Sequence, residues 1–480
     1  MISNKLKLLL ISIIISICLN INLQAQLMSN NNQADYIVIT PSQFVPTLQP
    51  FINWRQNKSL SVKVVELQQI YSEFPDSTKP SSIRDFVSYT LKYWSDPKPQ
   101  YILLVGGTKL LPSYKVPSQF ANYSDHKEDS VSIDEWYSVN LYDSDTKPDI
   151  FLGRFPVNNE QELNNVISKT IYFEDDISFK EYPTNFMFLT DKADSILFER
   201  SANTFINASL PSNFSKTTIF AGQDSTIEIT RERLFSGLNN GTLFFSYYGH
   251  GAPHIWSKYN LFTFGDVDSL KENDLPFILT SAACSQSFDI PSDSSIVRQL
   301  MVSYRSGTVA SINSSGLNYL NAGTLFLETF YKEIFNNPDI TIGDAVLKTK
   351  LHLEGNNASK DSIPRRYTLL GDPALKLPLN SITQVATRIN NIPNSYSLDQ
   401  NYPNPFNPST TINYSILEDG LVTIKVYDIL GREVITLVNE EKQPGNYEVK
   451  FNGDNLSSGI YLYKMTANDF VEVKKFVLTK

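Results

Sequence analysis

The chain has 480 residues, a hydrophobic content of 41% and a formal net charge of −9 at pH 7. This length is enough for roughly two to four domains, and the hydrophobic content is ordinary for a folded globular protein. Mild acidity without basic clusters disfavours nucleic acid as the main partner. The sequence also lacks HExxH, CxxC, phosphate-loop and GxSxG patterns, which disfavours a structural zinc site and a serine-hydrolase elbow.

The N-terminus has the pattern of a secretory signal peptide, predicted to span residues 1–25. Lys5 and Lys7 form its positive region, an apolar core follows at 8–17, and cleavage is predicted after Ala25. That core is too short for a comfortable membrane span, and no later run approaches about 18 apolar residues. We therefore expect an exported mature chain without a transmembrane segment.

The two cysteines fall on opposite sides of the predicted cleavage site. Cys18 lies in the signal peptide, so Cys284 is the one thiol expected in the mature chain, and no intramolecular disulfide is expected. Exported proteins usually use cysteine in pairs, so an unpaired cysteine is a candidate reactive thiol. The alternative is a buried cysteine that packs as a small hydrophobic residue.

Strands and helices alternate between residues 34 and 377, which favours a mostly parallel α/β sheet covered on both faces. The predicted strands are 36–40, 62–67, 101–105, 150–155, 186–190, 217–220, 242–248, 276–283 and 307–311, with a strand-to-turn signal at 369–373. The predicted helices are 43–54, 81–94 with a cap at Ser81 or Ser82, 160–172, 196–208, 231–238, 319–335 and 342–353. A proline-containing joint divides the region into predicted subdomains 34–180 and 181–377. The long acidic stretch 112–148 is predicted to be a functional or mobile loop.

The composition changes near residue 377. Residues 378–393 read as a polar linker. Residues 394–480 contain short runs with period-two alternation and regular turn signals, which predicts a small all-β, immunoglobulin-like sandwich. Its predicted strands are 411–416, 420–428, 433–438, 445–451, 459–467 and 470–478.

The stretch 244–290 carries the strongest chemical signal. The predicted strands 242–248 and 276–283 are separated by enough residues for a crossover with a short helix, which favours a parallel pair. Both strands would then deliver His250 and Cys284 to the carboxyl edge of the sheet, where the sites of open α/β sheets lie. A thiol and an imidazole on one edge are the parts of a nucleophile–base pair.

These residue types predict a division of chemical roles. His250 would assist formation of the Cys284 thiolate and later protonate the leaving amine. Cys284 would attack the scissile carbonyl, and the amides of Gly251 and Cys284 are candidates to hold the oxyanion. The glycines on both sides of His250 let the backbone turn sharply and let a substrate approach closely. The acidic loop offers three candidates for the group that orients the imidazole: Asp134, Glu128 and Asp129.

Several spaced motifs resemble the catalytic region of the gingipain-type cysteine peptidases. They are YILLVGG at 101–107, IDEWY at 133–137, IFLGRFPV at 150–157, GHG at 249–251 with Trp256 downstream, Cys284 with Phe288 and Asp289, and LLGDPAL at 369–375. The resemblance implies a caspase-like α/β sandwich in two subdomains. It also implies Cys284 as nucleophile, His250 as base and Asp134 as the acid that orients the imidazole. Trp256 and Asp289 are the predicted substrate-binding residues.

The last region resembles the type A C-terminal sorting domain of type IX secretion. The matching pieces are YPNPF at 402–406, PGNY at 444–447, LSSGIYLY at 456–463 and a Lys-rich finish. The resemblance implies export through the periplasm and across the outer membrane, with the type IX secretion machinery as a partner. The protein would then be secreted or attached to the outer cell surface. The alternative is a generic carbohydrate-binding or adhesion sandwich.

Together these features predict an exported cysteine endopeptidase that acts on protein or peptide substrates through a Cys–His dyad. No cofactor and no catalytic metal are expected, and calcium is an optional structural ion at the acidic loop. Two rival hypotheses stay open. One is a surface binding protein that keeps the peptidase fold without turnover, and the other is a sortase-like transpeptidase that passes the acyl group to an amine. The sequence does not indicate which side chain is preferred before the scissile bond.

Overall fold

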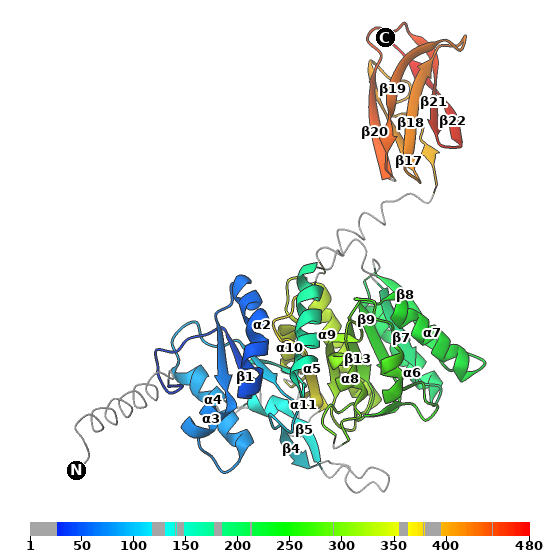
Figure 1. Cartoon of the computed structure of the whole chain (residues 1–480). Coiled ribbons are helices and arrows are strands. Elements are labelled where there is room, and N and C mark those ends of the chain that lie inside the picture. The colour runs from blue at the N-terminus through cyan, green and yellow to red at the C-terminus, as the bar shows by residue number, and fades with distance from the viewer. Residues whose placement is uncertain are drawn as a thin grey trace, which may run out of the picture. The chain divides into compact units, whose positions relative to one another are not determined.

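The structure, a computed structural model, describes residues 26–117, 130–139, 141, 148–176, 185–211, 214–290, 292–354, 363–377, 379, 395–443 and 445–480. The chain divides into two compact units, Met1–Asn380 and Ser381–Lys480 (Figure 1). The predicted signal peptide 1–25, the candidate acids Glu128 and Asp129, and all but one residue of the predicted linker 378–393 lie outside the described residues.

A ten-stranded sheet forms the centre of the first unit, in the order β2-β1-β3-β6-β15-β14-β13-β9-β7-β8 (Figure 1). Its strands are β1 (Tyr36–Thr40), β2 (Val62–Glu66), β3 (Tyr101–Val105), β6 (Phe151–Phe155), β7 (Asn185–Thr190), β8 (Ser215–Phe220), β9 (Phe244–Tyr248), β13 (Phe277–Ala282), β14 (Thr308–Ser314) and β15 (Tyr367–Leu370). Both β1 and β9 are buried at every position and are rich in β-branched or aromatic residues. Such composition suits strands that are covered on both faces.

The sheet consists of two blocks of parallel strands that run in opposite directions. Every neighbouring pair is parallel except β14 and β15, which are antiparallel. β15 comes late in the chain, in the predicted subdomain 181–377, yet it pairs with β6 of the predicted subdomain 34–180. The two halves therefore share one sheet. The predicted α/β fold with a mostly parallel sheet is confirmed, and the antiparallel junction is a feature that the sequence pattern does not indicate.

Helices surround this sheet, and short strands form two small sheets beside it. The helices are η1 (Ser42–Phe44), α2 (Val45–Asn57), α3 (Leu67–Glu73), α4 (Lys79–Tyr93), η2 (Asp134–Tyr137), α5 (Glu160–Ile171), η3 (Tyr172–Asp176), α6 (Ser195–Ser209), α7 (Ile227–Asn240), η4 (Phe264–Ser269), α8 (Ile296–Val302), α9 (Leu320–Asn336), α10 (Ile342–Glu354) and α11 (Ile363–Arg366). The short strands are β4 (Tyr114–Pro117), β5 (Ser130–Ile133), β10 (Gly251–Ala252), β11 (Ile255–Trp256) and β12 (Phe262–Thr263). Thr78, and neither Ser81 nor Ser82, caps α4, because its hydroxyl oxygen accepts the amide of Ser81 at 3.2 Å.

Side chains that alternate along β1 pack into two different hydrophobic clusters. Tyr36 and Val38 join the cluster that includes α2 and α5, whereas Ile37 and Ile39 join the cluster that includes α4. Because successive strand residues point to opposite faces, these clusters lie on the two faces of the sheet. The expectation of a doubly covered sheet is met for this strand.

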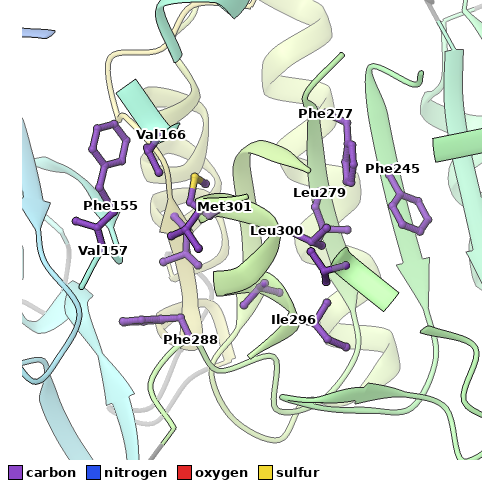
Figure 2. Close-up of a cluster of buried hydrophobic side chains, with 14 of the residues drawn as sticks. Phe155, Val157, Val166, Phe245, Phe277, Leu279, Phe288, Ile296, Leu300 and Met301 are labelled. Carbon is purple, nitrogen blue, oxygen red and sulfur yellow. The ribbon is translucent and has the colours of Figure 1, made fainter. Parts of the chain in front are cut away.

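The helix α8 links the two blocks of the sheet through the core. Figure 2 shows its side chain Met301 on the side of the first half of the region, near Phe155, and its side chains Leu300 and Ile296 on the side of β13, near Leu279. All five residues belong to one buried cluster. No sequence pattern predicts a helix at Ile296–Val302, so α8 is known only from the structure.

The end of α8 is held by a buried lysine from α5. The ammonium group of Lys169 donates to the carbonyl oxygens of Leu300 at 3.1 Å and Ser306 at 2.9 Å. Its side chain is 5% exposed, and this burial lowers the pKa of Lys169 to about 7. In the unfolded chain the same group titrates near its ordinary value of 10.5. Between these two values the unfolded chain binds more protons, so the contribution of Lys169 to stability rises with pH.

The Lys169→Met variant tests this linkage. We expect the free energy of unfolding of the natural protein, minus that of the variant, to increase between about pH 7 and about pH 10.5 by up to about 1.4 kcal/mol per pH unit. The difference should be flat below this window because the lysine is then charged in both states. Urea unfolding of both proteins at several pH values measures it. A difference that does not change with pH would contradict the buried, shifted lysine.

The second unit is a sandwich of two antiparallel sheets. One sheet has the order β16-β17-β20 and the other β19-β18-β21-β22. The strands are β16 (Ser397–Leu398), β17 (Ser409–Ile416), β18 (Gly420–Tyr427), β19 (Glu433–Lys442), β20 (Gly445–Asn452), β21 (Gly459–Ala467) and β22 (Phe470–Leu478). Inward residues such as Ile412, Ile424 and Tyr463 share one hydrophobic core. The period-two pattern therefore predicted the all-β sandwich correctly.

No helix in the described part of the chain combines the length and the apolar character that crossing a membrane requires.

Candidate active site

The predicted parallel pair that carries the candidate dyad is present. β9 and β13 are parallel neighbours, with Tyr248 opposite Ala282 in the register. His250 and Cys284 each lie two residues beyond these paired positions, so the chain delivers both to the same end of the sheet. The crossover between them contains the short sheet β10-β11-β12 and the 3₁₀ helix η4.

The backbone around His250 is held by a buried carboxylate at the end of β7. One oxygen of Asp191 accepts the amide of His250 at 3.1 Å, and the other accepts the hydroxyl of Ser257 at 2.6 Å. The hydroxyl of Tyr247 donates to the carbonyl oxygen of His250 at 2.7 Å. Gly249 is required here, because a Cβ at this position would lie 2.2 Å from the Tyr247 hydroxyl and 2.8 Å from the Asp191 Cβ.

The imidazole of His250 contacts a carboxylate from the loop that precedes α6. Its Nε2 lies 2.9 Å from Oδ2 of Asp194, and the two side chains are 56% and 60% exposed. The ring of Phe198 packs edge-on against the imidazole, with 5.2 Å between the ring centroids. Asp194 has a φ of 51°, the left-handed conformation that Asp adopts more readily than most residues. This turn sets the carboxylate beside the imidazole.

The thiol of Cys284 lies against the segment 314–318, which begins at the last residue of β14. Its Sγ is 3.3 Å from the carbonyl oxygen of Asn318 and 3.4 Å from the amide of the same residue. Burial raises the pKa of Cys284, although the Asn318 amide and the charge of Arg366 act in the opposite direction. The Cys284 side chain is therefore a neutral thiol at neutral pH, and it would need a base to become a thiolate.

A buried glutamine joins the cysteine loop to the loop of His250. The side-chain amide of Gln286 donates to the carbonyl oxygens of Cys284 at 3.0 Å and Ala252 at 3.4 Å, and its oxygen accepts the indole of Trp256 at 2.6 Å. A Cβ on Gly251 would lie 2.3 Å from this amide and 3.2 Å from the Cys284 carbonyl oxygen. The structure therefore brings the two predicted oxyanion residues, Gly251 and Cys284, against each other.

Asp134, the predicted partner of the imidazole, is engaged elsewhere. Its side chain is buried and binds the guanidinium of Arg154 through both oxygens, at 2.5 and 2.8 Å. Arg154 also donates to the carbonyl oxygens of Gly106 at 2.6 Å and Leu111 at 3.1 Å. The carboxylate that contacts His250 is that of Asp194. The expected Asp134–His250 contact is thus replaced by a pair that links η2 to β6.

The side chains of the two predicted substrate-binding residues, Trp256 and Asp289, contact other residues of the protein. Trp256 is fully buried and stacks on Tyr247, with 4.7 Å between the ring centroids. The carboxylate of Asp289 accepts hydrogen bonds from Thr108 and Ser132 and pairs with Lys115 at 3.0 Å. Burial alone would raise the pKa of Asp289, but these donors outweigh it and lower the pKa. Both side chains stabilise the loops next to His250 and Cys284. Their contact with substrate stays a prediction.

Four residues that contact the candidate dyad or its loops were not predicted from the sequence: Asp191, Asp194, Gln286 and Asn318. A signal for the two acids was present, since the sequence DKAD at 191–194 follows the predicted strand 186–190 directly. The carboxyl end of a strand in the same parallel block is where a site residue is expected. No comparable pattern marks Gln286 or Asn318, whose roles depend on loop contacts across the sheet edge.

Within the described part of the chain, no group of three or more His, Cys, Asp or Glu residues is placed to hold a metal ion. The expectation of a structural calcium ion rested on the acidic loop, and residues 118–129 and 142–147 of that loop lie outside the described residues. Calcium binding at the loop therefore stays a prediction.

Two family models match the chain, and together they cover most of it. Residues 29–378 match peptidase family C25, and residues 400–479 match the secretion system C-terminal sorting domain. The first match contains the whole ten-stranded sheet and the second contains six of the seven strands of the sandwich.

Among curated proteins, the chain is similar to gingipains of Porphyromonas gingivalis. It is 21% identical to gingipain R2 over 445 residues, which is 88% of this chain and 58% of that protein. It is 23% identical to Lys-gingipain over 265 residues, which is 54% of this chain and 14% of that protein. The chain thus spans little more than half of the length of the first relative.

Solved structures show the same fold. The complex of the Porphyromonas gingivalis RgpB pro- and mature domains superposes with a TM-score of 0.59 at 17% identity, and covers 92% of this chain and 100% of that chain. The Arg-specific cysteine proteinase gingipain R has a TM-score of 0.57 at 16% identity, and covers 94% of this chain and 98% of that chain. These likenesses confirm the predicted caspase-like α/β fold.

Proposed function

Because the chain belongs to peptidase family C25 and ends in a secretion system C-terminal sorting domain, we propose that it is an exported cysteine endopeptidase that hydrolyses protein or peptide substrates. The sorting domain marks the protein for the secretion machinery of the outer membrane, so it is secreted or attached to the cell surface. The observation that carries the catalytic proposal is the parallel pairing of β9 with β13, which brings His250 and Cys284 to one end of the sheet.

In the proposed reaction, His250 removes the proton of the Cys284 thiol, and Sγ attacks the carbonyl carbon of the scissile peptide bond. The amides of Gly251 and Cys284 hold the negative oxygen of the tetrahedral intermediate. The protonated imidazole then gives its proton to the leaving nitrogen, the C–N bond breaks and a thioester forms. Water attacks the thioester, which releases the acid product and restores the thiol.

Asp194 takes the role of the acid that orients the imidazole. Its carboxylate lies 2.9 Å from Nε2 of His250, which leaves Nδ1 as the ring nitrogen for exchange with the thiol. A carboxylate on one imidazole nitrogen favours the positive charge that develops when the ring takes a proton. Asp191 fixes the backbone of His250, because its carboxylate accepts the His250 amide at 3.1 Å.

Covalent labelling tests the proposal without knowledge of the natural substrate. A set of peptidyl acyloxymethyl ketones that differ in the residue before the reactive group should label the full chain once, at Cys284, as located by mass spectrometry. The Cys284→Ser variant should not be labelled, and labelled protein should lose the ability to cleave a peptide library.

Two other outcomes would assign the rival functions. A thiol that reacts with iodoacetamide but with none of the peptidyl probes, in a protein that cleaves no peptide, would indicate a binding protein on the peptidase fold. A library whose products carry an added amine instead of a free carboxylate would indicate a transpeptidase.

A further inference from the structure

The segment 314–318 packs against the thiol of Cys284. The amide of Ser285 donates to the carbonyl oxygen of Gly316 at 2.8 Å, and the amide of Gln286 donates to that of Ser314 at 2.8 Å. Ser285 has a φ of 48°, so the chain turns sharply directly after Cys284. The thiol of Cys284 meets the Asn318 end of the segment. The position of the thiol therefore depends on what holds the segment 314–318.

Arg366, the last residue of α11, holds this segment from the other side. Its guanidinium donates to the carbonyl oxygen of Leu317 at 2.8 Å, and its own carbonyl oxygen accepts the amide of Ser315 at 2.9 Å. A Cβ on Gly316 would lie 3.6 Å from Cδ and 3.7 Å from Nη1 of Arg366. The side chain, 5% exposed, thus runs directly against Gly316.

The neighbouring Tyr367 fixes the end of the segment that carries the thiol contact. The side-chain amide of Asn318 donates to the Tyr367 hydroxyl at 2.8 Å, and that hydroxyl donates to the carbonyl oxygen of Ser281 at 3.0 Å. The ring of Tyr367 stacks on Phe326 with 3.9 Å between the ring centroids. Two consecutive residues, Arg366 and Tyr367, therefore anchor the segment to β15 and β13.

The charges around the thiol come from different elements. Tyr247 of β9 and Tyr367 of β15 interact electrostatically with Cys284, and burial raises the pKa of both tyrosines, so they are neutral at neutral pH. His250 lies at the end of the neighbouring strand. Arg366 is the cation whose charge lowers the pKa of Cys284, against the larger effect of burial. A permanent cation favours the thiolate over the thiol.

We propose that Arg366 is a positioning residue for the nucleophile: it holds the segment 314–318 so that the Asn318 amide stays on Sγ, and it sets a buried positive charge on the same side of the thiolate. The inference rests on the proposed function, since it concerns the same thiol. It separates two contributions to thiolate formation, because His250 accepts the proton while Arg366 and the Asn318 amide stabilise the anion that remains.

The pH dependence of alkylation by iodoacetamide measures the thiol directly and needs no peptidase activity. Full-length protein is labelled across a pH series, and mass spectrometry follows the peptide that contains Cys284. In Arg366→Gln we expect the alkylation midpoint to move to higher pH and the rate near pH 7 to fall about tenfold for each unit of that move. The rate at high pH should match that of the natural protein. Arg366→Lys, which keeps the charge, should restore part of the rate near pH 7.

Arg298→Gln is the matched control. This arginine of α8 is also buried, but its guanidinium pairs with Glu162 of α5 at 2.6 Å. We expect its loss to lower stability in urea and to leave the alkylation midpoint of Cys284 unchanged. If Arg366→Gln does not fold, Arg366→Met replaces it, because methionine keeps the apolar length of the side chain. The same shift of the alkylation midpoint to higher pH is expected.

An alkylation midpoint that is the same with and without Arg366 would overturn the proposal. So would a fall in rate by one factor at every pH, since that pattern shows only a change in access. Neither result bears on whether the enzyme cleaves peptides. Conversely, a protein that shows the expected shift but labels with no peptidyl probe would keep the role of Arg366 in thiolate stabilisation and reject the peptidase function.

Discussion

Replacing Cys284 by alanine should reduce peptide cleavage to the uncatalysed level, a loss of about 10⁴-fold or more, because no other group can form the thioester. His250→Ala should lower kcat by about 10²-fold to 10⁴-fold, since the neutral thiol then lacks its base. Cleavage of a fluorogenic peptide chosen from the library, with active-site titration of the natural enzyme, measures both losses. The double variant should be no worse than Cys284→Ala alone, because the two residues act as one unit.

The Asp194→Asn variant tests whether Asp194 orients the imidazole of His250, the role that the sequence predicts for Asp134. We expect a loss in kcat of about 10-fold to 100-fold, because the imidazole keeps a hydrogen-bond partner but loses the charge that fixes its orientation. The stability of this variant should be nearly that of the natural protein, since Asp194 is 60% exposed. An unchanged kcat for Asp194→Asn would reject the role of this carboxylate.

Removing the buried partner of Arg154 should have the largest effect on stability. Asp134→Ala leaves the guanidinium of Arg154 fully buried without its carboxylate, and we expect the free energy of unfolding to fall by about 3–5 kcal/mol. The same guanidinium packs 5.4 Å from the ring of Phe288, in the loop that leads away from Cys284. Equilibrium urea unfolding measures the loss, and the midpoint should move to lower urea without a large change in slope.

A pair of variants separates this structural role from catalysis. Asp134→Leu combined with Arg154→Met removes both charges and should recover much of the stability lost in Asp134→Ala, because no buried charge is left alone. The exposed pair Lys109–Asp293 serves as a control, since replacing Asp293 by alanine should change stability little. A folded Asp134→Ala protein that keeps its stability but loses kcat as His250→Ala does would return Asp134 to the catalytic role first predicted for it.

Local patterns were sufficient to predict most of the helices and strands and the edge of the sheet at which His250 and Cys284 lie. The strands at 36–40, 459–467 and 470–478 have the predicted bounds, because buried runs and period-two alternation reflect the immediate environment of each residue. The delivery of His250 and Cys284 to the same edge of the sheet was also predictable. Two buried strands with a crossover between them are parallel, and parallel strands end together. The fold class followed from the same regularities.

Other features depend on strand order across the whole sheet. The short helix α8 has only seven residues and owes its place to a core shared by both blocks. The antiparallel meeting of β14 with β15 arises because the chain returns after α9, α10 and α11 and enters beside β6. Neither feature has a local signature, since each is stabilised by contacts between residues distant in sequence.

The partners of Asp134 and Asp194 show most directly which features follow from the sequence and which depend on the tertiary structure. The sequence by itself determined the fold class, the sorting domain and the placement of His250 and Cys284 at one edge of the sheet, because each depends on patterns within one or two segments. Only the tertiary structure decided that Asp134 binds Arg154, 20 residues away, and that His250 contacts Asp194, 56 residues away. A carboxylate binds the donor that folding brings within about 3 Å. That choice is made by sheet order and loop packing, which no single stretch of the chain contains.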